Sequence, residues 1–488
     1  MRDHAIQEGL AWEDNGLGPE ARWTRDPDIR AITRVCRRHL GIPADAAESD
    51  FVVSFYSDGA YNKLYNVRTP NGQFVMRVAL PVDPQNKTRG EAATLQLLAR
   101  KIPDVPVPQL VAFDDTRRNE IGYEWLLMSR LPGTPAYYRW RKMTMEQKEA
   151  LTARIAAFHA QLLRCGSVGE GFRGIGTLGA RCDDSDIDTA ITPDSVAEPG
   201  QVVTPFFFAG PRFHYPIRRG PFRSSHDWLR TQLNVIIKEQ TAALSQAQND
   251  DDKEYAETAL RVARKLLRIL HKIFPAIVNP PERTVLWHDD LTLRNILVDN
   301  QGNLTGIVGW FVSDTHLLSY LISADKPREC VSTVPRWVAS QVPEFLRGAE
   351  RETKPDRNCY TDVSDKGSEA GDEDGGDDTE DLDNEGKTEL YWIHLMEYEQ
   401  TQLRKVYCEH MRRLRPDWDL EVEEGALKVD FLNAITKCGS GFYLRRIEQW
   451  VDALERREFF PLLEVLRVGI KKDKKDKNNA TKSERGMT

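Results

Sequence analysis

The sequence contains no apolar run long enough to cross a membrane, and acidic residues near its start leave no apolar core for a secretory leader. It also contains no Cys-x-x-Cys pair that would indicate a zinc site or a redox motif. Together these absences predict a cytoplasmic protein with reduced thiols and no membrane partner. The seven scattered cysteines are Cys36, Cys165, Cys182, Cys330, Cys359, Cys408 and Cys438.

Little net charge remains outside two short segments of the 488-residue chain. Residues 361–389 hold thirteen acidic residues and two lysines, whereas residues 471–488 hold seven basic and three acidic residues. The net charge of −8 therefore comes mostly from the first segment, and the rest of the chain is nearly neutral. A nearly neutral body gives no electrostatic reason to expect nucleic acid or an anionic membrane as a partner.

A polar loop between short apolar runs is the most informative motif. Asp290 and Asn295 are five residues apart, between residues 285–287 and 296–298, which we expect to form short buried strands. Phosphoryl transfer needs an acceptor for the substrate hydroxyl proton and a ligand for the magnesium held on the phosphates. An Asp at one end of a loop and an Asn at the other deliver both groups to one place, so the spacing predicts a phosphoryl-transfer loop.

The residue after the next predicted strand, 304–308, is expected to point at the same metal, but it is Gly309, which has no ligand. Nearby acids do not replace it. Asp299 and Asp314 are out of register, and Asp289 points away from its neighbour in an extended segment. Loss of a magnesium carboxylate is expected to slow the reaction about 10²–10⁴-fold or more.

These motifs resemble the aminoglycoside phosphotransferase (phosphotransferase enzyme) family of protein-kinase-like folds, especially its fungal members. The family signature runs roughly His-x-Asp-Leu-x-x-x-Asn-Ile-Leu-Val, then Gly-Ile-Ile/Val-Asp-Trp-Glu. The sequence departs from it at Gly309, where the family has the metal-binding Asp, and at Phe311, where it has an acid. The matching residues are His288, Asp290, Leu291, Asn295, Ile296, Leu297, Val298, Gly306, Ile307, Val308 and Trp310.

The resemblance implies an α+β fold with two lobes, a small antiparallel-sheet lobe and a larger, mainly helical lobe. It implies ATP and Mg²⁺ as cofactors, with the departure at Gly309 putting the Mg²⁺ in doubt, and a small-molecule hydroxyl as substrate. Asp290 would be the catalytic base, and Asn295 would be the metal ligand.

The segment before the loop supplies the other candidate site residues. Ser57 and Gly59 lie in the turn between the first two expected strands, where backbone N–H groups would cover the phosphates. Arg77 on the third strand would contact the phosphates and pair with Glu91 of the next helix; the alternative is a surface arginine and a helix-start glutamate favoured by the helix dipole. Met128 lies in the segment expected to receive adenine through backbone groups, and its alternative role is in the core.

The pattern of the whole chain predicts seven helices and six parts. The parts are an N-terminal extension (1–50), a small nucleotide-binding lobe (51–132), a large helical lobe with the catalytic loop (133–360), an acidic disordered insertion (361–389), a C-terminal helical part (390–465) and a disordered basic tail (466–488). The expected helices are 28–40, 89–101, 144–163, 227–239, 254–274, 389–414 and 442–455.

Two other motifs suggest different chemistry. Residues 174–179 spell a Gly-x-Gly-x-x-Gly dinucleotide fingerprint, but they follow a predicted helix and not a strand, so we interpret them as a loop. His288 with Asp289 could begin a metal phosphohydrolase site, although a histidine that orients the loop fits its place at a strand end better. Two functions therefore remain: a small-molecule phosphotransferase impaired at Gly309, or an inactive kinase-like domain that binds nucleotide or protein partners.

Overall fold

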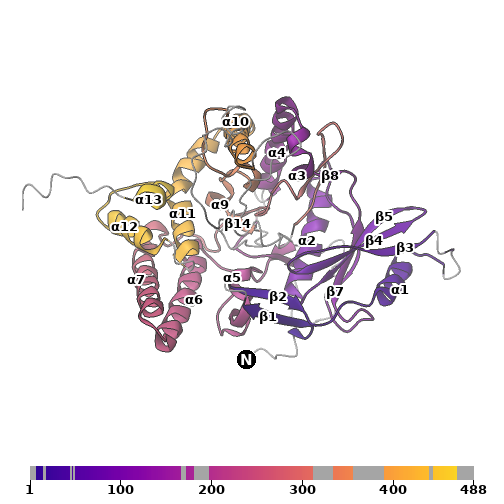
Figure 1. The fold of residues 1–488 in the computed structure, drawn as a ribbon, viewed down its shortest axis with the longest axis horizontal. Coiled ribbons are helices and arrows are strands. Elements are labelled where there is room, and N and C mark those ends of the chain that lie inside the picture. Colours follow the sequence, from indigo (N-terminus) through magenta and orange to yellow (C-terminus); the bar gives the residue numbers. More distant parts are fainter. Residues whose placement is uncertain are drawn as a thin grey trace, which may run out of the picture.

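The computed structural model describes residues 7–14, 18–43, 47, 50–165, 172–180, 197–310, 333–355, 389–438 and 443–469. The chain forms a small lobe built on an antiparallel sheet and a larger, mainly helical lobe (Figure 1), so the predicted α+β architecture with two lobes is confirmed. Within these residues, every helix is too short or too polar to cross a membrane.

The small lobe is a five-stranded antiparallel sheet in the order β3-β4-β5-β7-β6. Successive side chains of a strand point to opposite faces, and each face packs on a different helix. On β7, Trp125 and Leu127 pack in one core cluster with helix α1, whereas Leu126 and Met128 pack in another with helix α2. The elements are α1 (Ile29–His39), β3 (Val52–Asp58), β4 (Asn62–Thr69), β5 (Gly72–Ala79), α2 (Asn86–Lys101), β6 (Leu110–Asp114) and β7 (Glu124–Ser129).

The N-terminal extension contributes more than the single predicted helix. That helix is present as α1, and the Asp28 side chain caps it by accepting from Arg30 N at 2.9 Å. Before it, β1 (Leu10–Asp14) and β2 (Pro19–Trp23) form a hairpin that the sequence pattern did not predict. The hairpin lies beside α5 (Pro205–Phe208) of the large lobe (Figure 1).

The large lobe is a helical body in which distant segments pack together. All seven predicted helices of the chain are present, although α6 extends further than expected, and α11 was missed. Besides α5, the helices of the large lobe are α3 (Ala136–Arg139), α4 (Met145–Cys165), α6 (Ser225–Gln246), α7 (Asp250–Ile273), α9 (Arg336–Ala339), α10 (Glu389–Leu414), α11 (Trp418–Cys438), α12 (Leu444–Glu455) and α13 (Leu462–Val468). Short 3-10 helices lie at Trp140–Lys142, Gly210–His214 and Glu344–Leu346.

Helices of the structure overlap one end of the predicted acidic segment and one end of the predicted basic tail. Glu389 is the first residue of α10, so it does not belong to the acidic segment, and α13 reaches Val468 inside the predicted basic tail. Residues 361–388 and 470–488 lie outside the described residues.

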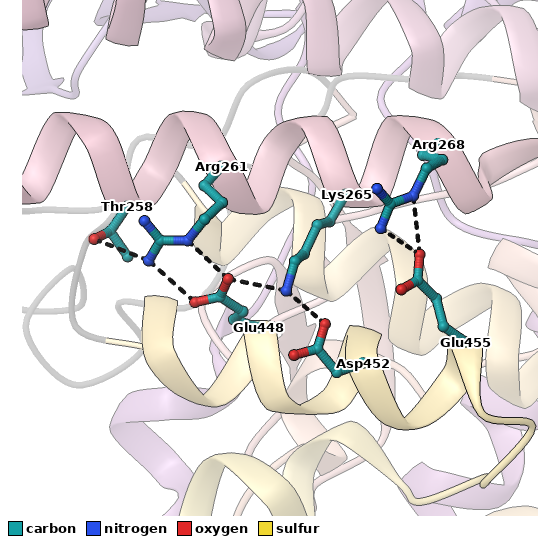
Figure 2. Close-up of polar contacts among 7 residues, drawn as sticks. All are labelled: Thr258, Arg261, Lys265, Arg268, Glu448, Asp452 and Glu455. Atoms are coloured by element: carbon teal, nitrogen blue, oxygen red, sulfur yellow. Dashed lines mark hydrogen bonds and ion pairs between the residues drawn. The ribbon is translucent and has the colours of Figure 1, made fainter.

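A ladder of ion pairs fastens α12 along α7 (Figure 2). Lys265 at its centre contacts both Glu448 (3.0 Å) and Asp452 (2.5 Å). Side chains spaced by three and four residues share one helix face, which is why both rows line up. The outer rungs are Arg261 with Glu448 at 2.8 Å and Arg268 with Glu455 at 2.6 Å.

The segment that carries the motif forms short strands, as predicted. The predicted strands 285–287, 296–298 and 304–308 correspond to β11 (Thr284–Leu286), β12 (Ile296–Val298) and β13 (Leu304–Ile307). β12 lies between β13 and β8 (Thr134–Pro135), a two-residue strand just after the connection between the lobes. The loop is therefore held by that connection as well as by its own hairpin. Two further pairs are β11 with β14 (Thr333–Pro335) and β9 (Leu178–Ala180) with β10 (Ala197–Pro199).

Candidate active site

The loop between β11 and β12 brings Asp290 and Asn295 into direct contact. The Nδ2 of Asn295 donates hydrogen bonds to the backbone O of Asp290 at 2.8 Å and to its Oδ2 at 2.6 Å. Thr292 closes the turn between them, with its N–H donating to Asp290 O at 2.9 Å. Both side chains are buried, with exposed fractions of 6% and 9%. The spacing therefore puts a carboxylate and an amide at one point, and their chemical roles stay predictions.

Gly309 lies directly against Asn295. The N–H of Val308 donates to Asn295 O at 2.9 Å, which fixes the end of β13 on the loop. Gly309 has a φ of +75°, a left-handed conformation that glycine adopts without penalty. A β-carbon there would lie 2.5 Å from Asn295 Cγ and 2.6 Å from both its Nδ2 and Oδ1. The asparagine amide thus fills the space that a larger residue 309 would need.

This geometry does not fit a magnesium ion held by Asn295 together with a carboxylate at position 309. Mg²⁺ prefers oxygen ligands in near-ideal octahedral geometry, and Asn295 turns its amide N–H groups toward Asp290. Within the described part of the chain, no group of three or more His, Cys, Asp or Glu residues could hold a metal ion. Phe311 and Asp314 lie outside that part. The described residues therefore disagree with the family pattern at the metal.

His288, at the start of the loop, orients it through contacts with the segment after β13. Its Nε2 lies 3.0 Å from the backbone O of Val308, and since a carbonyl only accepts, this nitrogen must carry the proton. The ring packs edge to face on Trp310, with centroids 4.6 Å apart. Burial lowers the pKa of His288 to about 4, so the ring is neutral near pH 7. These contacts agree with an orienting histidine, and no metal-ligand cluster surrounds it among the described residues.

A second buried histidine supports the same loop, and sequence reasoning missed it. His159 of α4 stacks on Trp287 at 4.4 Å, and its Nδ1 is hydrogen-bonded to the hydroxyl of Tyr407 in α10. Burial, followed by the charges of His288, Arg347 and Arg415, lowers the pKa of His159 to about 3. The histidine and its tyrosine partner are 248 residues apart, so no local pattern could have indicated the pair.

Arg77 and Glu91 form a buried ion pair between β5 and α2. The Arg77 Nη1 donates to Glu91 Oε1, and the two residues are only 6% and 3% exposed. The structure therefore brings together the two residues that the sequence predicted as partners. Among the described residues, neither Arg77 Nε nor Glu91 Oε2 has a hydrogen-bond partner. Buried polar atoms are normally satisfied, so these two atoms are exceptions among the described residues.

Gly59 lies in the turn after β3, whereas Ser57 belongs to β3 itself, opposite Leu64 of β4, which corrects its predicted place in the turn. A residue that the sequence analysis missed braces this turn. The N–H of Gly59 donates to Asn62 O at 2.9 Å, which closes the turn at the start of β4. The Asn62 Oδ1 accepts from Lys87 Nζ at 2.5 Å, and both side chains are buried. Lys87 is in the first turn of α2, where we expected no helix, so its role in the fold was not visible beforehand.

Nearby, Glu124 at the start of β7 is enclosed by the same helix. Its Oε1 accepts from the N–H of Gln85 at 2.7 Å, just before α2 begins. Burial raises the pKa of Glu124 to about 7, although the charge of Lys87 favours its ionised form. This carboxyl therefore titrates near neutral pH, close to the base of the turn.

Met128 has its side chain in the core of the small lobe, where it is 8% exposed. Contact with adenine would therefore have to come from backbone groups. The backbone N–H of Arg130, two residues on, donates to Gln73 O at 3.0 Å, so the segment prolongs the pairing of β7 with β5.

Comparison with known proteins gives a family and two sets of relatives. The profile of the phosphotransferase enzyme family matches residues 52–315. Two subtelomeric hrmA-associated cluster proteins of Aspergillus fumigatus, from different strains, are 30% identical over 173 residues and 29% identical over 176 residues. Each match covers 35% of this chain and 32% of the relative, so the chain spans about a third of the length of these relatives.

Solved structures of aminoglycoside phosphotransferases align over most of the chain. The gentamicin complex of APH(2")-IIa is 12% identical with a TM-score of 0.41, and covers 91% of this chain and 95% of its own. APH(4)-Ia is 11% identical with a TM-score of 0.38, and covers 89% of this chain and 100% of its own.

Proposed function

This chain belongs to the phosphotransferase enzyme family, and from that premise we propose that it binds ATP and transfers the terminal phosphoryl group to a hydroxyl of a small molecule, slowly because of Gly309. The observation that carries the proposal is the contact between Asp290 and Asn295 in the predicted loop. A carboxylate held in place by a neighbouring amide can accept the hydroxyl proton as the phosphoryl group leaves ATP.

Asp290 acts in this proposal as the base. Its Oδ2 is fixed by Asn295, so the carboxylate presents a constant direction to the acceptor hydroxyl. A base that is already oriented avoids part of the entropic penalty of the reaction. Asn295 is therefore a positioning residue for Asp290 here, in addition to its expected role toward a metal.

Arg77 supplies the positive charge for the phosphates. Glu91 accepts from one Nη of its guanidinium, and the buried Nε has no hydrogen-bond partner among the described residues. The planar guanidinium can donate to two phosphate oxygens at once. A lysine ammonium would act there as a single point charge. The turn after β3 would cover the same phosphates, with the N–H of Gly59 already donated to Asn62 O within the protein.

Magnesium enters no step of this proposal, because position 309 offers no carboxylate to join Asn295. Transfer would rest on Asp290, Arg77 and backbone donors. Loss of one electrostatic contact of this kind reduces rates by about 10²–10³-fold. We therefore expect turnover well below that of a complete site of this family.

A second function has one specific observation in its favour. Asn295 packs over Gly309 at a distance that leaves no room for a side chain, so the loop is adapted to the absence of the carboxylate. A site adapted in this way fits a domain that binds nucleotide, or a protein partner, without phosphoryl transfer.

Three proteins separate these functions. The wild type, Gly309→Asp and Asp290→Asn are compared for thermal stabilisation by ATP, with Mg²⁺ or with EDTA, and for ATP turnover. Wild-type turnover that disappears in Asp290→Asn supports the phosphotransferase. A nucleotide shift without turnover in the wild type supports the second function. If no protein shows a shift, both nucleotide-dependent proposals are wrong and only protein binding remains.

A further inference from the structure

A small hydrophobic cluster connects three parts of the chain that are far apart in sequence. It joins Tyr61, Leu80 and Val82 of the small lobe to Val203 and Phe208 of the large lobe, and the N-terminal hairpin packs on it through Trp12. Figure 1 shows the hairpin beside α5, next to the sheet. The cluster is separate from the main cores of both lobes, so it is a distinct contact between them.

Phe208 is the centre of this contact. It ends α5, a four-residue helix that Thr204 caps by accepting from Phe206 N at 3.3 Å. Phe206 and Phe207 belong to the core of the large lobe, and Phe207 lies 6.1 Å from Phe222. Phe208 instead points toward the small lobe, and it is fully buried there.

The partner of Phe208 in the small lobe is Tyr61, which follows the predicted phosphate turn and directly precedes β4. The rings of Tyr61 and Phe208 meet edge to face, with centroids 5.4 Å apart and an interplanar angle of 89°. Tyr61 also accepts through its backbone O from Leu80 N at 2.9 Å, which fixes it to the end of β5. Tyr61 immediately precedes Asn62, which closes the turn at Gly59.

The hairpin holds Phe208 from another direction. Trp12 of β1 stacks on Phe208 with centroids 6.4 Å apart, and Gln7 Nε2 donates to Val82 O at 2.9 Å. Gln7, just before the hairpin, thus contacts the small lobe, and Trp12 of the hairpin contacts the large lobe. A segment attached to both lobes restrains their relative movement.

We propose that Phe208 is a positioning residue for the nucleotide-site turn, holding Tyr61 and therefore residues 57–61 against the large lobe with the N-terminal hairpin as its backing. The consequence for nucleotide rests on the proposed function. A turn that is ordered before ATP arrives loses less entropy on binding, so ATP binds more tightly. A free turn would have to be ordered by the ligand.

The test compares Phe208→Ala with Phe207→Ala in the full chain. Both substitutions remove a buried phenyl ring from α5, but only Phe208 contacts Tyr61. Amide hydrogen exchange of residues 59–64 is measured in the nucleotide-free protein. We expect Phe208→Ala to speed this exchange about two- to tenfold, the range of an aromatic pair, and Phe207→Ala to leave it unchanged.

Equal effects of both alanine substitutions on residues 59–64 would show that Phe208 only stabilises the large lobe, and the proposal would be wrong. ATP affinity in EDTA is the second readout. If the wild type binds ATP and Phe208→Ala binds equally well, the turn does not position nucleotide and the proposal is again wrong. If exchange responds to Phe208→Ala but the wild type binds no ATP, the contact with the turn stands and the proposed function fails.

Discussion

The Asn295 side chain occupies the space beside Gly309 that a β-carbon would need: a β-carbon on the glycine would lie 2.5 Å from the Cγ of the asparagine. Position 309 therefore has no room for a side chain while Asn295 keeps its place. The positive φ of Gly309 adds to this, since it disfavours most side chains. A side chain introduced at position 309 therefore requires Asn295 to move.

The first prediction is that Gly309→Ala destabilises the protein by about 2–4 kcal/mol, because a left-handed residue with a β-carbon is strained and the contact with Asn295 adds overlap. Urea unfolding measures the change. Gly41→Ala is the matched control, since Gly41 also has a positive φ of +63° but open space around its β-carbon position. It should lose only about 1–2 kcal/mol. Equal losses in the two variants would mean that Asn295 rotates away freely.

The second prediction concerns Arg77 and Glu91. Glu91→Leu leaves a buried guanidinium without its counter-charge, and we expect about 3–5 kcal/mol of lost stability. The double variant Arg77→Met, Glu91→Leu removes both charges and should recover most of that loss. Chemical denaturation at neutral pH measures both.

Glu409→Ala is the surface control, because its partner Arg413 is 65% exposed, and it should lose about 0.5 kcal/mol or less. If the double variant is no more stable than Glu91→Leu, the loss comes from packing and not from the unpaired charge. ATP affinity of the double variant tests the phosphate role separately, and it should fall even where stability recovers.

Much of the fold could be predicted because its signals are local. Alternating strands, the capped helix at Asp28 and the Asp290–Asn295 spacing are all visible within a few residues. α11 was missed because Gly425 and two valines weaken its helical pattern. The structure gives the reason for the glycine: a β-carbon there would lie 3.0 Å from Ser340 Oγ in the neighbouring segment.

The missed parts of the site depend on contacts between distant residues. Lys87 reaches Asn62 across 25 positions, and His159 reaches Tyr407 across 248. The hairpin β1–β2 was missed because apolar and polar residues alternate only weakly in its sequence. Its burial comes in part from contact with Phe208 of the large lobe. A pattern search along the chain sees neither kind of contact, whereas the motif at Asp290 carries its own context.

The third prediction concerns the ladder between α7 and α12 (Figure 2). Lys265 contacts two carboxylates and is 22% exposed, whereas Arg268 contacts one and is 62% exposed. Lys265→Met should therefore lower stability by about 1 kcal/mol, and Arg268→Met by about 0.5 kcal/mol or less. Thermal unfolding at low and at high NaCl measures both. The loss for Lys265 should shrink less with salt, because partly buried pairs are screened less; equal screening would contradict this.

The last prediction is a pH dependence that originates at Glu124. Burial raises the pKa of this carboxyl from 4.5 to about 7 in the folded protein, so between these values the folded state holds a proton that the unfolded state has released. Stability therefore decreases as pH rises through this window, by about 3 kcal/mol in all. Lys87 and the N–H of Gln85 favour the ionised carboxylate, and Asp115 opposes it, but burial is the larger effect.

Glu124→Gln isolates this contribution, because the amide can still accept from Gln85 but does not titrate. Unfolding free energies of both proteins are measured from pH 5 to pH 8. The free energy of unfolding of the wild type should fall steadily relative to that of the variant as pH rises. His288 and His159, with pKa values lowered to about 4 and about 3, destabilise both proteins equally as pH falls below 6.5, so they cancel in the difference. A difference that stays constant with pH would show that Glu124 is ionised throughout and that Lys87 compensates its burial.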